Sequence, residues 1–135
     1  MARSRRGSPP SLLILDSGAV IALARGEERA RAFVQRAVEL EAWVEVPVVV
    51  LAETTRGTNR DAAVNRVVKA VGVFAPPETV GRLAGKLLGR TARTNVVDAL
   101  VAAEAVVLAA DVVTGDPADL ARLLVDHPGV AIVPL

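Results

Sequence analysis

The sequence predicts a three-layer α/β fold: a central parallel sheet of about five strands with helices on both faces. Short apolar runs alternate along the chain with stretches of helical apolar spacing, which is the pattern of strand–helix–strand units in a parallel sheet. A chain of 135 residues fits one domain, and its 52% of hydrophobic residues are enough for one compact core.

The chain divides into a short tail and one domain. Residues 1–11 combine three Arg with Ser, Gly and a Pro pair, and are predicted to form a flexible basic tail. A single domain is expected over residues 12–135. Its strands are predicted at Leu12–Leu15, Trp43–Val46, Val73–Ala75, Asp111–Thr114 and Val130–Val133.

Helices are predicted between these strands. Apolar residues recur with helical spacing over 30–37 and 63–71, which indicates an amphipathic helix in each range. The second helix is expected to start after Asn59 and to end at Gly72. Residues 98–109 are apolar on nearly every side except at Glu104, so this helix is expected to be buried.

Composition excludes several classes of protein and site. The chain has no Cys, which rules out disulfides and thiolate metal sites. Sixteen basic against fifteen acidic residues give a net charge of +1, so any nucleic-acid footprint must be local. Glu104 and Asp111 interrupt the longest apolar run, and Asp16 would lie inside the apolar region of a secretory signal. We therefore expect a soluble, cytoplasmic protein without a membrane span.

Four acids stand at the ends of predicted elements. Asp16 follows the first strand directly, and Asp116 follows the fourth in "VVTGDPADL". In an open α/β sheet, ligands bind beyond the carboxyl ends of the strands, so both acids fall at the functional edge. Glu53 lies on a helix entered after Pro47, and Asp98 lies in the first turn of the buried helix.

Helix capping is the alternative role for three of these acids. Asp116 is placed to cap a helix that has Asp119 at its third position. Asp98 fits the third position of a helix capped by Asn95, and Asp16 or Ser17 fits the cap of the following helix.

Glu53 has no capping role to explain it. Six of the seven residues before it are apolar, which suggests burial, and a buried carboxylate without a partner is costly. One divalent cation is a partner for all four acids at once, because it offsets their mutual repulsion. A site whose ligands are all oxygen atoms indicates Mg²⁺, with Mn²⁺ able to substitute.

The order of these motifs resembles the PIN domain, and specifically the VapC-type toxins of toxin–antitoxin pairs. The resemblance rests on the acid after the first strand, "LAET", "NVVDALVAAEA" and "VVTGDPADL", and covers about residues 12–135. It implies a three-layer PIN-like fold and a Mg²⁺-dependent endoribonuclease whose catalytic and metal-binding acids are Asp16, Glu53, Asp98 and Asp116. Supporting residues are Thr114, Asp119, Asn95 and Ser17, with Asp119 the alternative fourth ligand. It also implies an RNA substrate, a cognate antitoxin and a homodimer.

A basic stripe is the candidate RNA surface. Its members are Arg82, Lys86, Arg90 and Arg93. Their spacing places them within roughly 80° on one helix face. We expect no opposing acids along this stripe, which favours phosphate contact. A solvated surface without a partner is the alternative.

Other functions remain as competing hypotheses. A haloacid-dehalogenase-type phosphohydrolase is disfavoured because Gly18 stands where its second Asp is needed. A PIN nuclease of general RNA processing without an antitoxin is one alternative. A PIN-like module that binds RNA or protein without cutting is the other, and the presence of all four acids argues against it.

Overall fold

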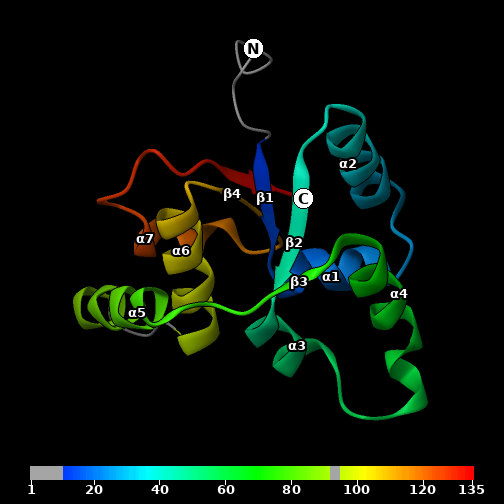
Figure 1. Cartoon of the computed structure of the whole chain (residues 1–135), viewed down its shortest axis with the longest axis horizontal. Coiled ribbons are helices and arrows are strands. Elements are labelled where there is room, and N and C mark those ends of the chain that lie inside the picture. Colours follow the sequence, from blue (N-terminus) through cyan, green and yellow to red (C-terminus); the bar gives the residue numbers. More distant parts are fainter. Residues whose placement is uncertain (1–10, 92–94) are drawn as a thin grey trace.

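The computed structural model describes residues 11–91 and 95–135, and its centre is a five-stranded parallel sheet (Figure 1). The strand order is β3-β2-β1-β4-β5, and every neighbouring pair is parallel. The strands are β1 (Leu12–Leu15), β2 (Trp43–Pro47), β3 (Val73–Phe74), β4 (Asp111–Thr114) and β5 (Ile132–Pro134). The predicted α/β fold class is confirmed.

Helices cover both faces of the sheet. They are α1 (Ser17–Ala24), α2 (Glu28–Glu39), α3 (Val48–Thr54), α4 (Ala62–Val71), α5 (Glu78–Arg90), α6 (Val96–Leu108) and α7 (Pro117–Leu123), with a 3₁₀ turn at Asn59–Asp61. Figure 1 shows α5, α6 and α7 on one side of the strands and α1, α2 and α4 on the other. α6 packs on β1 and β4, whereas α2 and α4 pack on β2.

The predicted strands are all present, and their small differences in length have local causes. β3 ends at Phe74 because Ala75 is followed by two prolines, which lack the amide hydrogen that a ladder needs. β5 begins at Ile132, since the N–H of Val130 is used in a turn that bonds it to the carbonyl of His127. The first ten residues of the predicted tail lie outside the described residues, and the carbonyl of Ser11 already accepts from the N–H of Trp43.

The core is built from aliphatic side chains. Ile14 and Leu15 of β1 are fully buried, as are Val112 and Val113 of β4. α6 is buried around most of its circumference, as its apolar sequence predicts, and even Glu104 is 1% exposed. No helix in the described ranges is long and apolar enough to cross a membrane.

The strand order places a topological switch between β1 and β4. From β1 the chain moves outward through β2 to β3, and it returns to β4 on the other side of β1. Helices that follow β1 and β4 therefore diverge, and ligands of such sheets bind at the carboxyl ends of these two strands.

Two glycines allow the segments after β1 and β4 to touch. A Cβ on Gly18 would lie 2.9 Å from Cα of Gly115, and a Cβ on Gly115 would lie 3.2 Å from Cα of Gly18. Both contacts are with backbone, which cannot turn away as a side chain can. The close approach of Asp16 and Ser17 to the end of β4 thus depends on two residues without side chains.

Replacing Gly18 with Ala should destabilise the fold by about 1–3 kcal/mol, because the methyl group forces the two backbones apart. Gly85→Ala is the matched control: Gly85 is also helical, and a Cβ there would meet nothing within 4 Å. This control should stabilise the protein by up to about 1 kcal/mol through helix propensity. Urea denaturation measures both changes, and equal effects of the two substitutions would contradict the packing explanation.

Candidate active site

Asp16 is buried at the carboxyl end of β1, where it both caps a helix and faces the neighbouring strand. Its side chain accepts a hydrogen bond from the backbone N–H of Ala19, 2.9 Å away, and so caps α1. Its other oxygen accepts from the hydroxyl of Thr114 at the end of β4. Burial raises the pKa of the Asp16 carboxyl, and these hydrogen bonds oppose that rise. The capping role and a site role are therefore compatible.

Thr114 connects the ends of the two central strands. It is fully buried, and its hydroxyl accepts from the N–H of Asp116 at 2.8 Å while donating to Asp16. One hydroxyl thus fixes the chain on both sides of the switch point. Its supporting role beside Asp16 and Asp116 stays a prediction, and these two hydrogen bonds are the contacts through which it would act.

Glu53 lies in α3 and is held by residues of two other helices. It is half-buried, less than its apolar neighbours predict. One carboxylate oxygen accepts from the hydroxyl of Ser17 in α1, and the other accepts from Nδ2 of Asn95 at 3.4 Å. These two donors are the partners that a carboxylate in this position requires.

Asp98 lies in the first turn of α6, and the negative charges of the other three acids act on its carboxyl group. Asn95 caps this helix, since its side-chain oxygen accepts from the N–H of Asp98 at 2.7 Å. The pKa of Asp98 is raised to about 6, first by burial and then by the charges of Glu53, Asp16 and Asp116. Asp98 is therefore the acid on which the charges of the other three act together.

The capping alternative for Asp116 holds for its position but not for its side chain. Asp116 is the N-cap residue of α7, with Pro117 in the first turn, but its exposed side chain makes no capping hydrogen bond. Asp119 forms an ion pair with Arg122 on the same helix, so its carboxylate is turned to a cation of the chain. Of the two candidates for the fourth acid, Asp116 is the one whose charge acts on Asp16 and Asp98.

These carboxylates do not converge on a single point. In residues 11–91 and 95–135, no three Asp, Glu or His side chains stand close enough together to hold a metal ion. Asp16 and Glu53 are instead turned toward hydroxyl and amide donors of the protein. Each carboxylate oxygen can accept more than one bond, so the set has free capacity for a hard cation. The neighbouring negative charges raise the pKa of Asp98, and a bound cation would offset these charges.

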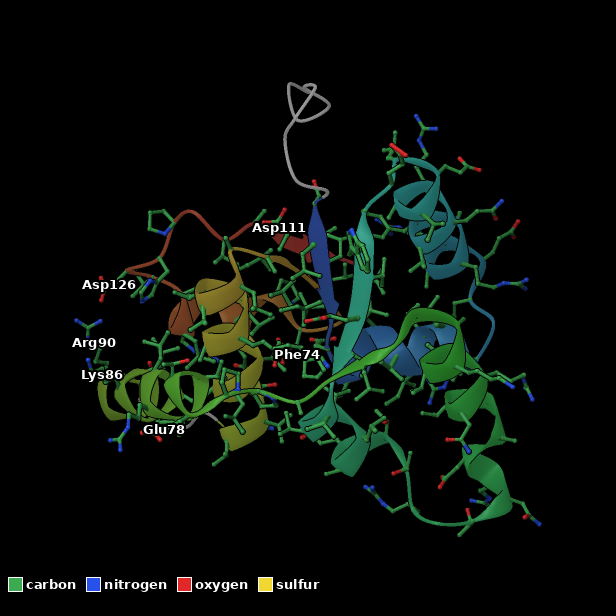
Figure 2. The ribbon with its side chains drawn as sticks, viewed as in Figure 1. Phe74, Glu78, Lys86, Arg90, Asp111 and Asp126 are labelled. Atoms are coloured by element: carbon green, nitrogen blue, oxygen red, sulfur yellow. The ribbon has the colours of Figure 1, made fainter. Side chains whose placement is uncertain are left out.

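The basic stripe has opposing acids after all. Arg82 pairs with Glu78 at 2.6 Å, and Arg90 pairs with Asp126 at 2.5 Å, so the expectation of an unopposed stripe is wrong. Figure 2 shows Lys86 and Arg90 at the outer end of α5, with Asp126 beyond them. Lys86 has no ion pair with any residue that the structure describes, and Arg93 lies outside the described residues.

Sequence reasoning missed the two glycines that let the site segments meet. Gly18 and Gly115 each follow a strand by a few residues, in "LDSG" and "VVTGD". A small residue just after each of two strands was the available signal. It carried no information that the two positions face each other, because that depends on the strand order.

Comparison with known proteins identifies the family. The model of the PIN domain matches residues 13–124. No curated protein sequence matched the chain. Several solved structures share its fold, and in each case the sequence identity is low.

Three of these structures illustrate the likeness. VapBC2 from Rickettsia felis, bound to a DNA fragment from its promoter, has a TM-score of 0.77 at 12% identity, covering 92% of this chain and 98% of that one. VapBC-1 from nontypeable Haemophilus influenzae has a TM-score of 0.69 at 18% identity, with 91% and 97% covered. VapBC-5 from Mycobacterium tuberculosis has a TM-score of 0.62 at 22% identity, with 93% and 100% covered. Because the family model spans most of the chain and the fold agrees, this chain belongs to the PIN domain family.

Proposed function

We propose that this chain is a metal-dependent endoribonuclease that acts as the toxin of a type II toxin–antitoxin pair. The observation that carries the proposal is the set of Asp16 and Asp116, which follow β1 and β4, with Glu53 of α3 and Asp98 of α6, called the acid cluster because the charges of the other three act on Asp98. These acids come from four separate segments, and their charges raise the pKa of Asp98. A fold that tolerates such repulsion without a structural gain is typical of a functional site. Membership of the PIN family supports a nuclease.

The cluster would hold Mg²⁺, with Mn²⁺ able to replace it. Asp16, Glu53, Asp98 and Asp116 are the proposed ligands, and the ion pair of Asp119 with Arg122 makes Asp119 the weaker candidate. When bound, the cation supplies an activated water and neutralises charge on the phosphodiester. Hard divalent cations with oxygen ligands suit this donor set, which contains no His or Cys.

Other side chains of the site orient these acids. Thr114 and the N–H of Ala19 hold Asp16 in one orientation. Ser17 and Asn95 do the same for Glu53, and Asn95 also fixes the first turn that carries Asp98. Such fixed carboxylates lose little freedom when they bind a cation or an RNA phosphate through it.

The proposed protein partner is an antitoxin. Proteins of this fold include a toxin-antitoxin complex from Klebsiella pneumoniae, at 17% identity and a TM-score of 0.65, and the VapBC proteins named above. We extend the pairing to this chain, together with a homodimer and a cytoplasmic location. A gene for a small DNA-binding protein beside this one would support the pairing.

The proposed RNA surface is the α5 stripe, with Lys86 as its available cation. Arg82 and Arg90 would have to exchange Glu78 and Asp126 for phosphates. Exposed ion pairs contribute about 0–1 kcal/mol to stability, so breaking them for phosphate contacts costs little free energy. Both pairs are well exposed.

Asp16→Asn and Asp98→Asn should each lower Mg²⁺-dependent RNA cleavage by about 100-fold or more, because each removes one ligand charge with little change of shape. Glu28→Gln, at an exposed position of α2, is the control and should keep the wild-type rate. Cleavage of a labelled RNA in Mg²⁺ or Mn²⁺ measures the effect. Wild-type cleavage by both site variants would refute the assignment of the metal-binding acids.

Stability should depend on pH through Asp98. Its pKa is raised in the folded protein, so its contribution to stability is present below about pH 4 and is lost as the pH rises through about 6. Asp98→Asn should therefore stabilise the metal-free protein at pH 7 by about 1 kcal/mol, after allowance for its partial exposure. Added Mg²⁺ should raise the Tm of the wild type more than that of the variant. Thermal unfolding with and without EDTA tests this, and a variant less stable than wild type in EDTA would contradict it.

RNA binding should become less salt-dependent when Lys86 is removed. Lys86→Gln should lower the slope of log K against log salt by roughly 0.7, the value for one phosphate contact with a single strand. Lys69→Gln, at an exposed position of α4 in the other helical layer, is the matched control. The affinity is measured in Ca²⁺, or with Asp98→Asn, so that the RNA is not cut. An unchanged slope in Lys86→Gln would contradict the proposal that the stripe binds RNA.

A further inference from the structure

A second group of carboxyls lies in the core, away from the acid cluster. Glu104, in the middle of α6, is 1% exposed, and Glu45 in β2 is half-buried. Their carboxyl groups are within hydrogen-bonding reach of each other. Glu45 Oε1 and Glu104 Oε2 are both buried without a hydrogen-bond partner in the part of the chain that the structure describes.

Such a contact requires a proton. An ionised carboxylate has acceptors and no donor, so two ionised groups cannot hydrogen-bond to each other. Burial and the neighbouring Glu45 raise the pKa of Glu104 to about 8, and burial also raises the pKa of Glu45. The pair therefore holds at least one proton at neutral pH.

Within residues 11–91 and 95–135, no other charge offsets this pair. The charged side chains on elements packed against α6 are Glu78, Arg82, Lys86 and Arg90 of α5, Asp119 and Arg122 of α7, Glu53 of α3 and Asp111 of β4. On the elements packed against β2 they are Glu28, Arg29, Arg31, Arg36 and Glu39 of α2, Arg66 and Lys69 of α4, and again Glu53 of α3. None of them contributes to the pKa of Glu104 or Glu45, which depends on burial and on the other member of the pair.

The pair joins two segments that each carry a site acid. β2 runs through Pro47 directly into α3, which bears Glu53. α6 begins at Val96 and bears Asp98 in its first turn. Between these segments the other side-chain hydrogen bond in the described residues is the long one from Asn95 to Glu53, at 3.4 Å. A second connection between them lies in the core, at Glu45 and Glu104.

We propose that Glu45 and Glu104 share a proton that holds α6 against β2 and thereby positions Asp98 relative to Glu53. Both glutamates are positioning residues, since neither reaches the acid cluster. The positioning part rests on the proposed metal site; the shared proton does not. When the shared proton leaves in alkaline solution, two adjacent buried charges repel, and this link between α6 and β2 is lost.

The shared proton is tested first on the unaltered protein. Infrared spectroscopy of the wild type should show the band of a protonated carboxyl at about pH 7, and titration should remove it above about pH 8. Glu104→Gln should lack this band, whereas Glu28→Gln should keep it. Absence of the band from the wild type at neutral pH would overturn the proposal.

Stability gives a second, independent readout. Between about pH 6.5 and 8, the Tm of the wild type should fall as the pH rises, because the folded Glu104 keeps a proton that the unfolded chain has released. Glu104→Gln should flatten this slope, since its amide donates to Glu45 without titrating. Glu45→Gln should flatten it also and serves if Glu104→Gln does not fold. A slope equal to that of wild type in a folded variant counts against the shared proton.

The positioning role is tested with the metal alone. Millimolar Mg²⁺ should raise the Tm of the wild type at about pH 7.5 and by less than half as much at about pH 9, whereas Glu104→Gln should respond equally at both values. Equal responses of the wild type at the two pH values, or an equal loss in Glu104→Gln, would overturn positioning. No Mg²⁺ response in any protein at either pH would instead refute the metal site, and the infrared band would still decide on the proton.

Discussion

The hydrogen bond from Thr114 to Asp16 connects the two strands on which the rest of the site depends. β1 and β4 are neighbours in the sheet although most of the chain separates them, and this contact lies where both strands end. Thr114 also accepts from the N–H of Asp116, so the same hydroxyl sets the direction in which the chain leaves β4. At a switch point the helices after the two strands diverge, and this contact fixes the positions from which they start.

Several negatively charged side chains lie around this contact. Burial raises the pKa of Asp16, and the other acids add to the rise at Asp98. Separate hydrogen-bond donors hold the carboxylates of Asp16 and Glu53 in place. The two side chains therefore cannot rotate away to reduce the repulsion. A stable aliphatic core makes this possible, since sites that break the usual rules of burial depend on the surrounding structure for compensation.

Sequence patterns predicted most of the fold because they are local. Apolar runs located each strand, and the parallel topology predicted that the acids after β1 and β4 lie at the same edge of the sheet. Patterns failed where a contact joins distant segments. Asp126 meets Arg90 across 36 positions, and Gly18 meets Gly115 only because β1 and β4 are adjacent. Glu78, by contrast, is four residues before Arg82, so that ion pair was readable from the sequence.

Glu104 shows the same limit within the core. Its isolated position in an apolar helix marked it as unusual, but its partner on β2 became visible only in three dimensions.

The pairing of β1 with β4 has a consequence for the protein during its synthesis. Asp16 and Thr114 are 98 positions apart, so the contact between them cannot form until the chain has been synthesised through β4. A nascent chain that ends before β4 can pair β1 with β2, yet it lacks both Thr114 and Asp116. Chains truncated before β4 therefore carry at most three of the four candidate acids.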